Sequence, residues 1–203
     1  MSFSRRQSPF ANAALVVTVR PVDMGAAMGG RSDSLVGMDW QREIERKAAQ
    51  MGGGKLVAPV QRAADFLEGR VSSGEIKSSY RMGVKAAACH DLYPAFVTDT
   101  LREALCSFER RLPGFICENA ILHGVETRTS APVRIVRDTD NLTSETIRNL
   151  YPAGEGAGYA GGIISAAVDG MKVAASILQD EGQEVDWASL LRQVEIPWTV
   201  VAG

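Results

Sequence analysis

The residues best suited to chemistry in this sequence form a glycine-rich stretch near its end, LYPAGEGAGYAGGIISAAVDG at 150–170. Gly156, Gly158 and Gly161 have the spacing G-x-G-x-x-G. In this pattern glycines let a ligand approach the backbone closely, and the N–H groups that open the next helix bind phosphate or another electron-rich group. The stretch predicts a strand, a tight turn and a helix, with a ligand at the helix N-terminus.

The same glycines also have a purely structural interpretation, a turn that lets a strand and a helix pack closely. Two features depart from an ordinary dinucleotide-binding unit. The spacing begins with fewer than fifty residues of the chain left. Asp180 and Glu181 lie at about the distance expected of the ribose-binding acid, but they end a predicted helix rather than a second strand. The glycines alone leave ligand binding and tight packing both open.

Other residues give weaker signals. The two histidines are His90 and His123; we expect His123 to be a packed or surface residue, and His90 has no second Cys or His at a metal-ligand spacing beyond Cys89. We therefore predict no metal site. A serine hydrolase has no support, because the sequence lacks G-x-S-x-G. The polar segment ETRTSAPVR at 126–134 is either an anion or substrate loop or a plain hairpin.

Composition narrows the class of protein. Hydrophobic residues make up 45% of the chain and charged residues 23%, which is ordinary for a globular domain, and a net charge of -2 gives no reason to expect nucleic acid. No apolar run approaches the roughly 18 residues that a membrane span needs. The odd number of cysteines, without C-x-x-C spacing, is typical of a reducing compartment. Among them, Cys106 lies in a helical pattern, where we expect a small core residue.

Hydrophobic periodicity predicts the elements that would position these groups. Their order indicates an α/β class, with α+β as the alternative, and not a complete doubly wound sheet. Strands are expected at 13–19, at 132–136, at 149–154 and, as a pair around a turn at Glu118–Asn119, within 113–128. Helices are expected at 39–51 with Asp39 as N-cap, at 59–69, at 94–112, at 163–179 and at 186–194, with an extended loop at 70–87.

The 163–179 helix has the clearest pattern, an apolar face opposite a polar one. The apolar face consists of Ile163, Ile164, Ala167, Val168, Met171, Ala174, Ala175 and Leu178. The polar face consists of Ser165, Asp169, Lys172, Ser176 and Gln179.

Beyond these patterns, the sequence resembles a largely uncharacterised family of FAD-dependent dehydrogenases found in bacteria and in plastid-bearing eukaryotes. The resemblance runs from about residue 4 to residue 178, and the glycine stretch and ETRTSAPVRI are its most specific parts. Further similar blocks, in the same order, are SRRQSPFANAALVVTV, GMDWQREIERKAAQMGGG, APVQRAADFLEGR, ERRLPGF and GVETRTSAPVRIVRD.

The resemblance implies a flavoprotein of the two-dinucleotide type with FAD as cofactor. In such proteins an N-terminal βαβ unit holds the diphosphate, a substrate domain follows, and a final strand and helix return to the FAD domain. Residues 1–136 would be a substrate-domain-like region with flanking strands, and residues 137–203 the C-terminal segment of the FAD domain. Residues near the FAD would be Gly154, Glu155, Gly156, Ala157, Gly158, Tyr159, Ala160, Gly161, Gly162 and Ile163. Residues facing the substrate or the flavin would be Arg128, Thr129 and Ser130.

Within that scheme Glu155 would hydrogen-bond the ribityl or phosphate region, and the backbone of 160–163 would lie near the pyrimidine edge of the flavin. The N-terminal G-x-G-x-x-G of the family is absent, so we expect the C-terminal portion of a longer protein. The expected function is hydride transfer through flavin N5 on an unknown small-molecule substrate, with no general acid or base assigned.

Two other functions stay open, a non-catalytic interaction domain and a phosphate- or nucleotide-binding module without redox chemistry. The expected location is the cytoplasm or the plastid stroma. The Arg- and Ser-containing start has the composition of a transit peptide, although a polar loop before a strand is the favoured interpretation. The pattern leaves the oligomeric state open.

Overall fold

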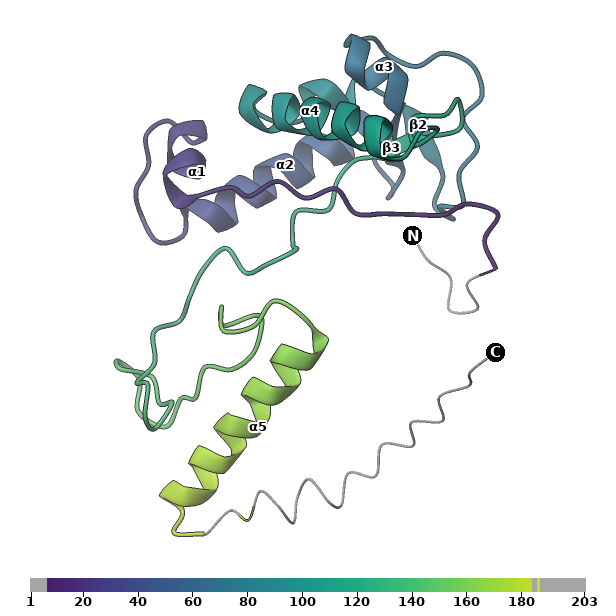
Figure 1. Ribbon diagram of the computed structural model, residues 1–203. Coiled ribbons are helices and arrows are strands. Elements are labelled where there is room, and N and C mark those ends of the chain that lie inside the picture. The colour runs from purple at the N-terminus through teal and green to yellow at the C-terminus, as the bar shows by residue number, and fades with distance from the viewer. Residues whose placement is uncertain (1–6, 184–185, 187–203) are drawn as a thin grey trace. The chain divides into compact units, whose positions relative to one another are not determined.

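The structure is a computed structural model that describes residues 7–183 and residue 186 (Figure 1). The chain divides into a first unit, Met1–Pro132, and a second unit, Val133–Gly203. Helices and a small mixed sheet confirm a fold of the α/β or α+β kind. The elements are α1 Pro21–Ala27, α2 Val36–Gly52, β1 Ala58–Arg62, α3 Ala63–Glu68, β2 Val84–Ala86, η1 Cys89–Asp91, α4 Ala95–Arg111, β3 Ile121–His123 and α5 Ile163–Asp180.

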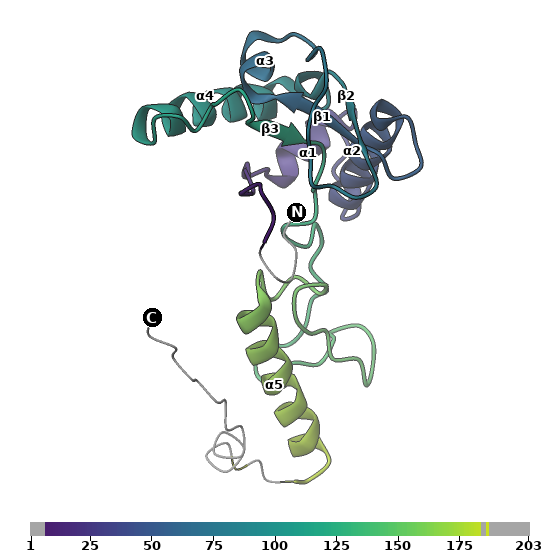
Figure 2. The ribbon, with the colours of Figure 1, turned by 90° about the vertical axis from the view of Figure 1, so that its right-hand side faces the viewer.

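The sheet of the first unit has the order β2-β1-β3, with β1 parallel to β2 and antiparallel to β3. In this register Val60 lies opposite both Ala86 and His123. Residues 58–61 are all buried, and because successive side chains point to opposite faces, both faces of β1 are covered. Figure 2 shows α2 and α4 on opposite sides of the strands.

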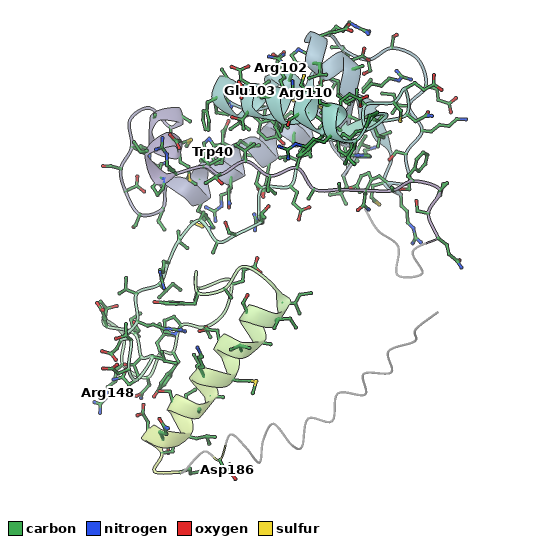
Figure 3. The ribbon with its side chains drawn as sticks, in the orientation of Figure 1. Trp40, Arg102, Glu103, Arg110, Arg148 and Asp186 are labelled. Carbon is green, nitrogen blue, oxygen red and sulfur yellow. The ribbon has the colours of Figure 1, made fainter. Side chains whose placement is uncertain are left out.

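Two apolar clusters form the core of the first unit. One joins Trp40 and Ile44 of α2 to Leu92, and Figure 3 labels Trp40 in that position. The other joins Phe66 of α3 to Leu105 of α4, together with the buried Cys89. The two long helices of the first unit, α2 and α4, therefore each bury apolar residues in the core.

The long helices are the best-predicted elements. The α4 helix occupies Ala95–Arg111, within the predicted 94–112. The α2 helix begins at Val36, three residues before the predicted start, because Asp39 does not cap it and instead pairs with Arg31 and Arg42. It ends as expected at a glycine, Gly53, which adopts the left-handed conformation that glycine tolerates best.

The predicted helix at 59–69 is wrong in its first half. Residues 58–62 form the central strand β1, and only Ala63–Glu68 are helical. The run Ala58–Gln61 is buried on both faces, and a short buried strand lacks the alternating pattern that would identify it in sequence. The end of the helix is correct, since Gly69 provides a left-handed cap.

The strand predicted at 13–19 is not found. Its side chains alternate between half-buried and exposed, as in a strand, and Val16 is 65% exposed. No segment of the described chain forms a ladder with it. The run has the local pattern of a strand but no paired neighbour. Sequence periodicity does not indicate whether such a neighbour exists.

The paired strands predicted within 113–128 are reduced to β3, which pairs with β1 rather than within a hairpin. The residues before β3 form turns held by the carboxylate of Glu109, which accepts hydrogen bonds from the N–H groups of Gly114 and Ile116. Of the 70–87 loop, Val84–Ala86 forms the short strand β2.

The second unit contains α5 and a long irregular segment. The strands predicted at 132–136 and 149–154 are both wrong, because the backbone groups in them bond to turns: Ile135 N–H donates to Ala157, and Leu150 C=O accepts from Ser144. The helix predicted at 163–179 is confirmed as Ile163–Asp180. The helix predicted at 186–194 lies outside the described residues.

The buried side of α5 differs from the apolar face that its sequence predicts. Its buried residues include Asp169 and Ser176 from the polar face, while Ile163 and Ile164 of the apolar face are 89% and 76% exposed. No helix in the described part of the chain is long and apolar enough to cross a membrane.

The cysteines provide a test of the first unit. Cys106 is exposed, so the expectation of a core residue is wrong, and Cys117 is exposed as well. Cys89 is 3% exposed, and burial raises the pKa of its thiol to about 11. At pH 8 only about one Cys89 thiol in a thousand would be ionised.

We predict that iodoacetamide alkylates Cys106 and Cys117 in the folded protein and leaves Cys89 unmodified, because both access and thiolate are lacking there. Peptide mass spectrometry after a timed reaction measures this, and all three should react in urea. Alkylation of Cys89 at the rate of the other two would contradict the packing of the Phe66–Leu105 cluster.

Candidate functional site

The glycine stretch forms a closed turn directly before α5. Tyr159 N–H donates to Gly154 C=O at 3.0 Å, and Gly158 N–H donates to Glu155 C=O at 2.9 Å. Gly154 and Gly158 adopt φ values of 68° and 84°, in the left-handed region that favours glycine. The chain then reaches Gly162, the N-cap of α5. The sequence therefore predicts the turn and the helix correctly, but no strand leads into them.

A buried ion pair holds this turn against α5. Asp169, two turns into the helix, accepts two hydrogen bonds from the Arg137 guanidinium, at 2.6 and 3.0 Å. Arg137 also donates to Pro152 C=O at 2.6 Å, and Gly154 N–H donates to Asp169 at 2.7 Å. The side chains of Arg137 and Asp169 are only 7% and 11% exposed. We call this set of contacts the Arg137–Asp169 clasp.

Tyr159 connects the same turn to the segment that carries Arg137. Its hydroxyl accepts a hydrogen bond from Arg137 N–H at 3.1 Å and donates one to Ile135 C=O at 3.0 Å. The guanidinium carbons of Arg137 and Arg134 lie 3.6 and 4.3 Å from the Tyr159 ring centroid, so the ring contacts two cations. The turn is thereby fixed at both of its ends.

The electrostatics of the clasp favour the ionised carboxylate. Hydrogen bonding from Arg137 is the main cause that lowers the pKa of Asp169, and the Gly154 N–H acts in the same direction. Burial opposes this effect because it penalises the charged form. Asp169 is therefore ionised at neutral pH and cannot supply a proton to a ligand.

The glycines of the motif differ in what a side chain at each position would contact. A Cβ on Gly158 would lie 2.7 Å from the Val133 carbonyl oxygen, so this glycine is required for tight packing. A Cβ on Gly156 or Gly161 would have no atom within 4 Å. The structural interpretation therefore holds for Gly158, while Gly156 and Gly161 adjoin open space.

Two polar groups of the same stretch have no side-chain partner. The first N–H groups of α5 donate to no side chain of the N-cap residue, because that residue is Gly162. The Glu155 carboxylate makes no hydrogen bond or ion pair with any described residue. The turn thus presents donors at the positive end of a helix and one free carboxylate acceptor.

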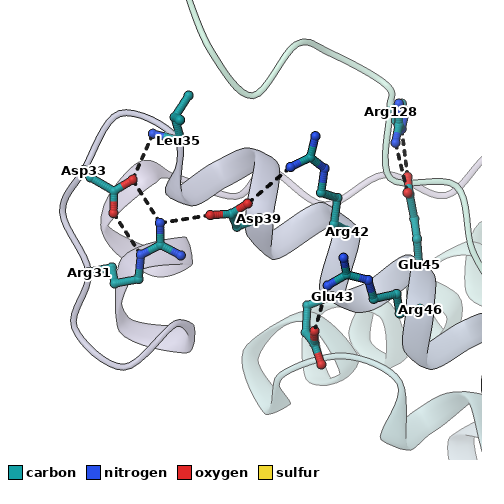
Figure 4. Close-up of polar contacts among 9 residues, drawn as sticks. All are labelled: Arg31, Asp33, Leu35, Asp39, Arg42, Glu43, Glu45, Arg46 and Arg128. Carbon is teal, nitrogen blue, oxygen red and sulfur yellow. Dashed lines mark hydrogen bonds and ion pairs between the residues drawn. The ribbon is translucent and has the colours of Figure 1, made fainter.

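The predicted substrate-facing residues lie in the first unit, and one of them, Arg128, is tied to α2. Figure 4 shows Arg128 paired with Glu45, at 2.8 and 3.0 Å. Thr127 Oγ1 also donates to Glu45 at 2.8 Å, and its carbonyl accepts from Gln41. Hydrogen bonding from Arg128 is the main cause that lowers the pKa of Glu45. Arg128 is therefore committed to α2, whereas Thr129 and Ser130 are exposed.

The histidines belong to structural contacts. His90 Nδ1 lies 2.8 Å from the amide nitrogen of the buried Gln61, whose Oε1 accepts the His90 backbone N–H. His123 lies 2.8 Å from Ser78 Oγ, and burial lowers its pKa. Across the described residues, no three His, Cys, Asp or Glu side chains form a metal-binding group.

Comparison with known proteins identifies the family. Residues 1–129 match the family described as "FAD-dependent protein, C-terminal domain-like". The chain belongs to this family of FAD-dependent proteins. An uncharacterised protein of Clostridium beijerinckii is 46% identical over 181 residues, which are 88% of this chain and 33% of that protein. The chain thus spans about a third of the length of the curated relative that it matches.

The similarity to this relative includes the second unit. A continuous alignment over 88% of 203 residues omits about 24 residues, so it includes the glycine turn and all but the end of α5. The family relation is therefore shown by the first unit and extends in sequence to the candidate site. The relative is uncharacterised, so it assigns no substrate.

Sequence reasoning missed the clasp itself. Asp169 lies on the face of α5 that the pattern assigns to solvent, and Arg137 follows a predicted strand that does not form. The one available signal was an acidic residue in the middle of a helix that otherwise carries few charges.

We predict that Asp169→Asn weakens the second unit selectively. The change leaves the buried Arg137 without its carboxylate, which costs about 3 kcal/mol. Hydrogen exchange should show faster exchange of the Gly154 amide and of α5, with the first unit unchanged. Glu181→Gln, which changes an exposed carboxylate at the C-cap of the same helix, is the matched control. Equal exchange rates in both variants would contradict the clasp.

Proposed function

We propose that the turn at 154–163 is the closing contact of an FAD site, and that the complete family protein is an oxidoreductase that transfers hydride through flavin N5. The observation that carries this proposal is the open space at Gly156 and Gly161, beside an uncapped helix start. Membership of an FAD-dependent family supports FAD as the ligand.

The residues present fit such a cofactor. A flavin is a broad, flat group that needs close access to backbone, and glycines without neighbours at the Cβ position give that access. The uncapped N–H groups at the start of α5 suit an electron-rich or negatively charged edge. A Cβ at either open glycine would occupy the approach of the ligand.

The protein's own groups would then have distinct tasks. The N–H groups near Ile163 would orient the ring and stabilise negative charge on it, because a helix N-terminus carries a partial positive charge. The free Glu155 carboxylate would accept a hydrogen bond from a ribityl hydroxyl. FAD, when bound, supplies the hydride chemistry. Thr129 and Ser130, with exposed hydroxyls, remain the proposed substrate-facing residues, and Arg128 would position that segment through Glu45.

The rest of the cofactor site would come from elsewhere in the longer protein. This chain carries one glycine motif, and its relative is three times as long as the matched segment. We propose that the diphosphate-binding part lies in the remaining two-thirds.

We predict that Gly161→Val weakens FAD binding at least about tenfold without loss of stability, because the new side chain meets the ligand and no protein atom. Gly170→Val is the control, since Gly170 of α5 is another glycine with open space at its Cβ position. Flavin absorbance and fluorescence, titrated against the purified chain, measure binding. Thermal unfolding measures stability, and Gly158→Ala should lower it because of the contact with Val133.

Unchanged FAD affinity in Gly161→Val would refute the site assignment. Binding of ATP or of a simple phosphate ester, with no response to FAD, would favour a nucleotide- or phosphate-binding module. A chain that takes up neither would favour the non-catalytic interpretation for this chain on its own.

A further inference from the structure

Arg134 carries a guanidinium whose charge is not neutralised by any described residue. The residue is exposed, and its side chain forms no hydrogen bond or ion pair within the described part of the chain. Its guanidinium carbon lies 4.3 Å from the centroid of the Tyr159 ring. Arg137, the second cation at this ring, differs because Asp169 and Pro152 C=O accept its N–H groups. Arg134 therefore keeps both its charge and its hydrogen-bond donors available.

The Tyr159 ring holds the Arg134 guanidinium without occupying its donors. A cation–π contact uses the positive charge and not an N–H bond to an acceptor, so the donors stay available to a ligand. The ring itself is fixed, because its hydroxyl accepts from Arg137 N–H at 3.1 Å and donates to Ile135 C=O at 3.0 Å. A cation that is already ordered loses less side-chain entropy on binding than a free surface arginine.

Arg134 also lies beside the middle of the glycine turn. A Cβ on Gly158 would be 3.0 Å from Arg134 Cα and 3.1 Å from Arg134 Cβ, so the two segments are in direct contact. Gly156 and Gly161, which adjoin open space, flank Gly158 in the sequence. Glu155, the free carboxylate of the turn, forms no ion pair with Arg134. The available cation is therefore next to the turn that carries the open glycines.

We propose that Arg134 binds an oxyanion, a phosphate or a carboxylate, on the ligand that occupies the glycine turn. A planar guanidinium matches two oxygens of either group and donates two parallel N–H bonds to them. Tyr159 is then a positioning residue, which keeps the guanidinium beside the turn. The presence of a ligand at the turn rests on the proposed function, and the oxyanion belongs either to FAD or to an anionic substrate.

Inorganic pyrophosphate is the probe, titrated at constant ionic strength into the isotope-labelled 203-residue protein and followed by NMR through the Gly158 and Tyr159 amide signals. We expect both signals to shift saturably. Arg134→Gln should weaken the affinity about tenfold, because charge-assisted hydrogen bonds are lost. Arg134→Lys, which keeps the charge but not the planar fork, should have an intermediate affinity.

The matched control is Arg148→Gln, which should bind pyrophosphate like the wild type. Arg148 is another exposed arginine of the second unit, labelled in Figure 3, and it contacts no aromatic ring among the described residues. The Gly154 amide reports whether each variant keeps the clasp, and we expect its shift to be unchanged. If Arg134→Gln disturbs that signal, the comparison between wild type and Arg134→Lys decides the outcome.

Two results would overturn the proposal directly. One is the absence of a saturable shift with pyrophosphate in the wild type. The other is equal affinity in the wild type and in the Arg134 variants, because the anion would then be held by other groups.

Titrations with FAD and with riboflavin, which lacks phosphate, identify the source of the oxyanion. Loss of FAD affinity in Arg134→Gln, with riboflavin unaffected, assigns the oxyanion to the cofactor. Unchanged affinity for both flavins, together with the pyrophosphate response, assigns it to the substrate. Equal loss for both flavins would overturn the proposal, because Arg134 would then contact the ring. A protein that binds pyrophosphate through Arg134 and takes up neither flavin would refute the FAD site and leave the oxyanion site standing.

Discussion

The second unit depends on one interaction, the buried pair between Arg137 and Asp169. Two charges removed from water need nearly complete hydrogen bonding, and the pair obtains it from Pro152 C=O and Gly154 N–H. The pair sets the rotation of α5 about its axis, because Asp169 must face inward. The side of α5 that is buried and the shape of the turn before it both follow from this constraint.

The clasp also explains why the glycine motif can serve packing and binding at once. Gly158 fits against the backbone of residues 133–134, and Tyr159 anchors the turn through its hydroxyl and ring. With these contacts made elsewhere, Gly156 and Gly161 stay free beside the start of α5. A rigid turn with open glycines requires little reorganisation to accept a ligand, which supports a cofactor-contacting role in an FAD-dependent family.

Sequence periodicity predicts the helices of this protein far better than its strands. A helix such as α4 satisfies its own backbone, so its pattern and its ends are local. A strand needs a neighbouring strand, and the 13–19 run has the right alternation but no such neighbour among the described residues. The opposite error occurs at β1, a strand that the sequence pattern predicts as part of a helix. For the site, the glycine spacing predicts the position of the turn. The ion pair that holds this turn joins Arg137 and Asp169, which lie 32 residues apart in the sequence.

The most direct test of this account is an NMR pH titration of the Asp169 side-chain carboxyl carbon together with the Gly154 amide proton. A pKa lowered by Arg137 means that the stabilisation is complete above the unfolded value of about 3.9 and is lost as the pH falls through the lower folded value. We predict a carboxyl midpoint below 3.9 and a Gly154 shift with the same midpoint. A carboxyl that titrates at its ordinary value, with Gly154 unaffected, would contradict the clasp and the turn it is held to organise.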